Sequence, residues 1–160
     1  ILVKKAVFAG TFDPFTIGHY DLVKRAAEVF DEVIVGVAGN GSKKKCIATT
    51  EQRADIVRLS LSDVKNATVK VFDGLLTDFA SENGAKYLVR GIRNGVDFEY
   101  EKNLMAVYQA TNPEIEIFYL ISQPTLSFVS SSFIKDLKFL HGEIDKYVSP
   151  NALELIEKIY

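Results

Sequence analysis

The chain has 160 residues, 48% hydrophobic and 25% charged, a composition that excludes extended disorder and suits a single domain spanning 1–160. Its 19 basic and 21 acidic side chains give a formal charge of −2, so we expect no nucleic-acid partner and only local anion sites. One cysteine, Cys46, and the lack of any uncharged apolar run of roughly 18 residues favour a cytoplasmic protein with no membrane contact.

Strand-like and helix-like patterns alternate along the chain. Apolar, β-branched runs predict strands at residues 5–9, 32–37, 68–72, 87–89 and 116–121. Apolar residues at helical spacing predict helices at 19–30, from 49, at 75–83, 98–110 and 132–140, and from 150. This alternation predicts an α/β fold, a doubly wound (Rossmann-like) five-stranded parallel sheet with helices on both faces.

The loops that follow the strands are the expected site, because ligands of such sheets bind at the carboxyl ends of strands. In the first loop, Gly10 gives a ligand close access to the backbone, and Thr11 adds a hydroxyl. His19 stands in the first turn of a helix, whose free N–H groups favour phosphate. A helix-capping histidine is the alternative interpretation, but it leaves the dense Gly, Thr and His pattern unexplained.

Four motifs in order carry a resemblance to a known family. The first, 10–14 followed by Thr16-Ile17-Gly18-His19, resembles the signature of the nucleotidyltransferase superfamily that uses a (H/T)xGH motif. Its threonine form resembles the bacterial phosphopantetheine adenylyltransferases. The other matches to that family are 42–44, 90–93 with 97–101, and 127–132 with Lys135. Departures from the family pattern are Ala9, Asn94 and Leu126.

The basic residues of these motifs could have purely structural roles instead of binding a ligand. Lysines 43–45 could form a solvated loop; beside a phosphate-binding loop we favour Lys43 as a ligand. Arg90 and Arg93 offer planar, permanently charged donors to phosphate oxygens. Surface ion pairing is their alternative, with Asp97, Glu99 or Glu101 as partners.

The serines and leucines of the motifs are also ambiguous. Residues 130–132 supply hydroxyls and free N–H groups suited to a phosphate tail, and helix capping would use the same groups. Leu76 is typical of a core residue, yet the family places its pantetheine arm against this segment.

The resemblance implies the reaction ATP + 4′-phosphopantetheine → dephospho-coenzyme A + pyrophosphate, the penultimate step of coenzyme A biosynthesis. It implies direct in-line attack of the substrate phosphate on the α-phosphorus, without a covalent enzyme intermediate. Mg²⁺ is expected to bind through the ATP phosphates and not through protein side chains. A homohexamer and feedback inhibition by coenzyme A are further implications.

The resemblance also assigns residues. The implied catalytic residues are His19, Lys43 and Thr11. Phosphopantetheine is expected to contact Thr11, Lys43, Leu76 and Arg90. ATP is expected to contact Thr11, Phe12, His19, Gly91, Ile92, Arg93, Glu101, Leu126, Ser127, Phe128, Val129, Ser130, Ser131 and Ser132.

Two other functions remain open at this point. One is another enzyme of the superfamily, joining a nucleotide to glycerol phosphate or a similar phosphate; Thr16 in place of histidine speaks against it. The other is a non-catalytic module that senses ATP or coenzyme A through the same loops. A pure binder needs no group aimed at a transition state, so this function is disfavoured by the combination of Thr11, His19, Lys43, Arg90 and Arg93.

Overall fold

The computed structural model describes residues 2–39 and 45–160. In that part of the chain, one all-parallel sheet has the strand order β3-β2-β1-β4-β5. The strands are β1 (Lys5–Gly10), β2 (Glu32–Ala38), β3 (Ala67–Phe72), β4 (Tyr87–Ile92) and β5 (Glu116–Ile121). The predicted doubly wound, five-stranded parallel sheet is therefore confirmed.

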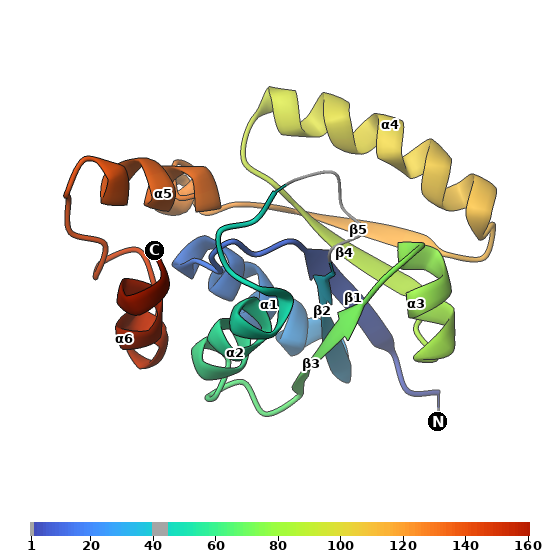
Figure 1. Ribbon diagram of the computed structural model, residues 1–160. Coiled ribbons are helices and arrows are strands. Elements are labelled where there is room, and N and C mark those ends of the chain that lie inside the picture. Colours follow the sequence, from blue (N-terminus) through green and yellow to red (C-terminus); the bar gives the residue numbers. More distant parts are fainter. Residues whose placement is uncertain (1, 40–44) are drawn as a thin grey trace.

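Helices cover both faces of the sheet (Figure 1). One face carries α1 (Ile17–Val29), α2 (Thr50–Ser60) and α6 (Pro150–Ile159), and the other carries α3 (Leu76–Glu82) and α4 (Gly95–Thr111). The 3-10 turn η1 (Pro124–Leu126) leads into α5 (Ser131–Phe139), which inserts Ile134 into the same core as α6.

Strand β2 shows why the sheet is buried on both sides. Val33, Val35 and Val37 belong to the core under α1, α2 and α6, whereas Ile34 belongs to the core under α3. Successive side chains of a strand point to opposite faces, so a nearly continuous apolar run fills both cores.

Helix caps account for several boundaries. Thr49 caps α2 in a reciprocal capping box with Gln52, as their spacing predicts. Helix α4 begins at Gly95, earlier than the predicted 98, because Asn94 accepts a hydrogen bond from the N–H of Asp97. Pro150 is the first residue of α6, as predicted, but Ser149 before it makes no side-chain cap bond.

The strand order reverses at β1. Strand β1 pairs on one side with β2, the next strand in the sequence, and on the other side with β4, which comes much later in the sequence. Such a reversal opens a crevice at the carboxyl ends of the two central strands. The loops after β1 and β4 therefore face each other there.

Candidate active site

Two cavities lie at this crevice and share a wall. The larger, of about 670 Å³, is lined by residues of the loops after β1 and β4 and by the start of α5. The smaller, of about 480 Å³, lies toward α3 and α4. Both are lined by Ala9, Gly10, Thr11 and Arg90. Two ligands that filled these cavities would thus meet at Thr11 and Arg90.

Most of the residues expected to bind ATP line the larger cavity. These are Thr11, Phe12, His19, Gly91, Arg93, Glu101, Val129, Ser130, Ser131 and Ser132. Ile92, Leu126, Ser127 and Phe128 line neither cavity, and Leu76 lines the smaller one together with Arg90. Lys43 lies outside the described residues.

The ring of His19 is held from three sides. Its Nδ1 accepts a hydrogen bond from the N–H of Thr16 at 3.0 Å, so the ring proton resides on Nε2. The rings of Phe12 and Phe15 pack against it, with centroids 5.1 and 5.2 Å away. His19 and Thr16 also form the capping box of α1. The capping interpretation is thus satisfied, and Nε2–H remains available as a donor.

Burial, together with the nearby charge of Arg93, lowers the pKa of His19 to about 4. At neutral pH the imidazole is therefore neutral and acts as a hydrogen-bond donor. Phe12 contributes to the burial of His19, because its own ring is buried and packs against the imidazole. The backbone of Phe12 has a positive φ of 53°.

We predict that the His19 ring titrates in the folded protein with a midpoint near pH 4, followed by NMR of its Cε1 proton. The chain has two histidines, so His141→Asn identifies the His19 signal. Between about pH 6.5 and 4 the unfolded state binds more protons, so this residue makes folding stability fall as the pH is lowered. A midpoint near 6.5 would contradict the described environment.

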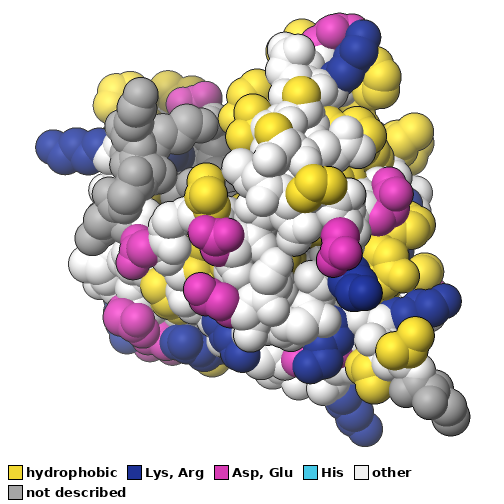
Figure 2. Space-filling model, turned by 90° about the vertical axis from the view of Figure 1, so that its right-hand side faces the viewer, with side chains coloured by type: hydrophobic (Ala, Val, Ile, Leu, Met, Phe, Trp, Pro, Cys, Tyr) yellow, Lys and Arg dark blue, Asp and Glu magenta, His cyan; other side chains and the backbone are white. Residues whose placement is uncertain are grey.

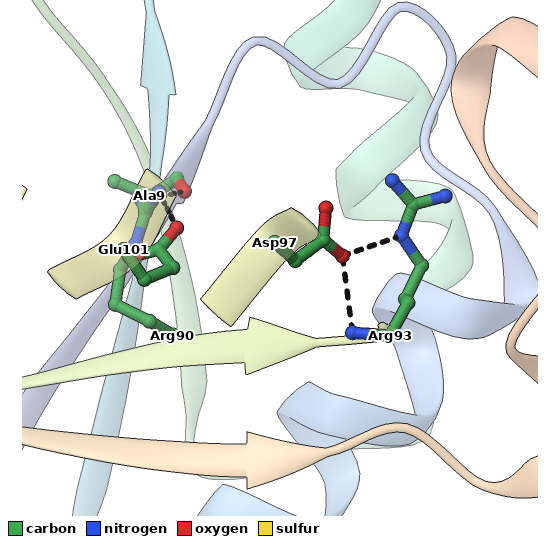
Figure 3. Close-up of polar contacts among 5 residues, drawn as sticks. All are labelled: Ala9, Arg90, Arg93, Asp97 and Glu101. Carbon is green, nitrogen blue, oxygen red and sulfur yellow. Dashed lines mark hydrogen bonds and ion pairs between the residues drawn. The ribbon is translucent and has the colours of Figure 1, made fainter. Parts of the chain in front are cut away.

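Arg90 and Glu101 form a two-pronged ion pair between β4 and α4 (Figure 3). Nε and Nη2 of Arg90 donate to the two carboxylate oxygens of Glu101 at 3.0 and 2.7 Å, and Nη1 donates to the carbonyl of Ala9 at 3.3 Å. Burial opposes the charge of Arg90, but the hydrogen bonds that Arg90 donates to Glu101 and the nearby negative charge raise the pKa of Arg90 overall. The ion pairing considered as the alternative for Arg90 is thus present. Both carboxylate oxygens of Glu101 accept hydrogen bonds from Arg90 and so fix the guanidinium at the wall that the two cavities share.

Arg93 also has a carboxylate partner. Its N–H and Nε both donate to one oxygen of Asp97, at 3.0 and 3.2 Å. Figure 3 shows its two terminal nitrogens pointing away from Asp97. Because Arg93 lines the larger cavity, these nitrogens are placed to meet an anion there.

The start of α5 closes the larger cavity. Ser130 accepts a hydrogen bond from the N–H of Phe133 at 3.0 Å, and Ser131 donates to the carbonyl of Pro14 at 2.8 Å. Capping is therefore satisfied by Ser130, while Ser132 is exposed. A Cβ at Gly18 would lie 3.3 Å from the carbonyl oxygen of Val129, so glycine allows α1 to approach this segment closely.

Phe128 is an exposed residue among those expected to bind ATP in this segment. The residue is 53% exposed, and its ring packs edge-on against Phe133 and Tyr147, with centroids 5.3 and 6.0 Å away. Leu126 is half-buried, and its carbonyl accepts the N–H of Val129.

Sequence reasoning missed Arg53, a fully buried residue of α2. Its guanidinium donates to the carbonyls of Thr11, Ala38 and Ala48, and to the hydroxyl of Thr50. It therefore ties the ends of β1 and β2 to the start of α2. The available signal was a charged residue at helical spacing from the apolar residues of α2 at positions 56 and 57.

The described residues contain neither a metal-binding cluster nor a membrane-spanning helix. Among residues 2–39 and 45–160 no group of three or more His, Cys, Asp or Glu side chains could hold a metal ion. In the same ranges no helix is both long and apolar enough to cross a membrane.

Comparison with known proteins first defines the class. A family model described as cytidylyltransferase-like matches residues 7–137. The structure of a bifunctional NMN adenylyltransferase/ADP ribose pyrophosphatase from Francisella tularensis, complexed with AMP and a Mn ion, has the same fold. Its TM-score is 0.70 at 17% sequence identity, and the match covers 98% of this chain and 49% of that one. The protein is thus a nucleotidyltransferase.

Relatives of similar length narrow the class. The phosphopantetheine adenylyltransferase of Shouchella clausii is 38% identical over 158 residues, 99% of each chain. That of Ralstonia pickettii is 42% identical over 147 residues, covering 92% of this chain and 87% of the relative. The chain belongs to the phosphopantetheine adenylyltransferase family, as its four motifs indicate.

Proposed function

We propose that the protein transfers the adenylyl group of ATP to 4′-phosphopantetheine, forming dephospho-coenzyme A and pyrophosphate. This is the penultimate step of coenzyme A biosynthesis. The observation that carries the proposal is the wall that the two cavities share at Thr11 and Arg90. A reaction between two phosphorylated molecules needs a place where both phosphates meet, flanked by donors and positive charge.

The substrate brings its own nucleophile, so no covalent enzyme intermediate is needed. The phosphate of phosphopantetheine attacks the α-phosphorus of ATP in line, and pyrophosphate leaves from the opposite side. The protein's task is positioning and neutralising charge between two anions. Thr11 orients the attacking phosphate with Lys43, and Arg90 binds it at the shared wall.

His19 is the proposed catalytic donor. Its neutral Nε2–H faces the cavity in which the triphosphate lies and stabilises charge that develops on the α-phosphate. A neutral donor keeps its proton through the reaction, so this role requires no change of protonation state between substrates and products.

The remaining contacts are proposed for the two cavities and, at Ile92, Leu126, Ser127 and Phe128, for segments that line neither of them. Arg93, Ser130, Ser131 and Ser132 bind the leaving pyrophosphate. The nucleoside contacts Phe12, Gly91, Ile92, Glu101, Leu126, Ser127, Phe128 and Val129. The pantetheine arm lies in the smaller cavity, where Leu76, Leu104 and Tyr108 supply apolar surface. Coenzyme A carries the same arm and is proposed as a feedback inhibitor.

Mg²⁺ is proposed to enter bound to the phosphates of ATP, where it neutralises part of their charge. The larger cavity fits this mode of binding, because it presents Arg90, Arg93 and Lys135, and because residues 2–39 and 45–160 form no carboxylate cluster that could hold a metal ion. A cytoplasmic location is part of the proposal, supported by the single cysteine, which cannot form an internal disulfide.

We also propose that the protein is a homohexamer, and apolar surface on α4 and β5 supports a buried interface there. Hydrophobic side chains gather along the top of the face in Figure 2, which α4 forms, and down its right-hand margin. The large exposed apolar residues of the two elements are Val96, Phe98, Tyr100, Val107, Phe118 and Ile121. Light scattering should give six times the mass of one chain, and a monomer at working concentration would refute the assembly.

Isotope exchange tests the proposed reaction. With ATP, Mg²⁺ and phosphopantetheine, dephospho-coenzyme A and pyrophosphate should form in equal amounts. Labelled pyrophosphate should enter ATP only when phosphopantetheine or dephospho-coenzyme A is present. Exchange in their absence would indicate an adenylyl-enzyme and contradict direct attack.

A further inference from the structure

Asp13 is a buried carboxylate among the residues that line the larger cavity, and only 4% of its surface is exposed. One oxygen accepts the N–H of Ile47 at 2.9 Å, and the other accepts the N–H of Ala48 at 3.2 Å. The hydroxyl of Tyr160, which follows α6, donates to the same oxygen as Ala48. Two segments that are far from Asp13 in the sequence, and from each other, thus converge on its side chain.

The fourth partner of Asp13 is a cation that faces the nucleotide cavity. Nζ of Lys135, one turn into α5, lies 3.5 Å from Oδ2 of Asp13, and both residues line the larger cavity. Lys135 is about one-third exposed, so its amine borders the space proposed for the triphosphate. The start of α5 is tied to the same loop by the bond from Ser131 to Pro14.

We propose that Asp13, held by Tyr160 and by the N–H groups of residues 47 and 48, is a positioning residue that fixes the Lys135 ammonium against the triphosphate. Asp13 itself has no role in touching substrate, because its oxygens are engaged by its own partners. The proposal rests on the proposed function, and it adds two residues, Tyr160 and Lys135, to the machinery that binds the nucleotide.

The charge of Asp13 agrees with this role. Burial alone would raise its pKa, but hydrogen bonds from Tyr160, Ile47 and Ala48 and the charge of Lys135 hold the pKa below its usual value. An ionised carboxylate on a phosphate-binding wall would repel substrate unless it were paired. Pairing with Lys135 removes that repulsion and restrains a long, flexible side chain.

Tyr160→Phe tests the network with the smallest change of shape. Tyr20→Phe is the matched control, because the Tyr20 hydroxyl also donates to a carboxylate, that of Asp63. Neither Tyr20 nor Asp63 lines either of the two cavities. Loss of one charge-assisted bond at Asp13 should lower kcat/KM for ATP about three- to tenfold, with a smaller change in KM for phosphopantetheine. Tyr20→Phe should leave these constants within about twofold.

A merely structural role predicts a different pattern. Tyr160→Phe would then lower the melting temperature as Tyr20→Phe does, with kcat/KM for ATP unchanged, and the proposal would be overturned. ATP affinity measured by calorimetry separates this inference from the proposed reaction. Weaker ATP binding in Tyr160→Phe, in a protein inactive toward phosphopantetheine, would keep the positioning role and reject the reaction.

A double-mutant cycle tests whether Asp13 acts through Lys135. Asp13→Asn should lower kcat/KM for ATP about tenfold in the parent chain and less than about threefold in the Lys135→Met background. Losses that multiply independently would overturn the proposal, provided that each variant retains its fold by circular dichroism.

Discussion

Replacing His19 with alanine is expected to lower kcat on the order of 10²-fold or more, the typical cost of removing one preorganised donor from a transition state. The imidazole is held between Phe12 and Phe15 and fixed in tautomer by Thr16, so it needs no reorganisation during the reaction. Because the donor acts on charge that develops late, ATP affinity should change little. Steady-state kinetics and calorimetric ATP binding measure the two effects separately.

His141→Ala is the matched control for this variant. His141 follows α5 and lines neither the larger nor the smaller of the two cavities that share a wall. Its replacement should leave kcat unchanged. A His19→Ala protein that binds ATP and turns over at a near-normal rate would remove His19 from the catalytic role.

Glu101→Ala is expected to have the largest effect on stability. It leaves the Arg90 guanidinium, whose side chain is 18% exposed, without its carboxylate partner. An uncompensated buried charge costs about 3–5 kcal/mol. Urea unfolding at fixed protein concentration measures this loss, and activity should fall with it because Arg90 is no longer fixed at the shared wall.

The double variant Arg90→Met with Glu101→Leu separates stability from function. Removing both charges should recover most of the unfolding free energy, since apolar side chains of similar size replace a buried pair without an unpaired group. Activity should remain lost, because no guanidinium binds the attacking phosphate. A single Glu101→Ala loss below about 1 kcal/mol would show that the pair is not buried in solution.

The sheet could be predicted because the residue patterns that specify its strands and helices are short and local in the sequence. The apolar run from Val33 to Val37 is typical of a strand in a parallel sheet that is covered on both faces. The spacing of Thr49 and Gln52 predicts the start of a helix. The end of β4 could not be placed, because the polar Arg90 is typical of a loop. In the structure the ladder to β5 continues as far as Ile92 and Ile121.

The site was predictable only where a side chain lies inside a motif. Motif residues such as Thr11, His19 and Arg90 lie where the strand ends bring them together. Glu101 could be named as an ion-pair partner of Arg90 because it lies in the same motif, but the partners that come from distant segments were not predictable. Arg53 contacts Thr11 across 42 positions, and Tyr160 reaches Asp13 across 147. Such contacts depend on packing in three dimensions, which no local pattern encodes.

Substrate selection tests the central claim most directly. Pyrophosphate release should be measured with ATP, Mg²⁺ and 4′-phosphopantetheine, beside CTP with glycerol phosphate and ATP with nicotinamide mononucleotide. We expect pyrophosphate release with phosphopantetheine alone, and the loss of this release in His19→Ala. Turnover with another pair and none with phosphopantetheine would contradict the proposed substrate. ATP binding without release from any pair would contradict catalysis itself.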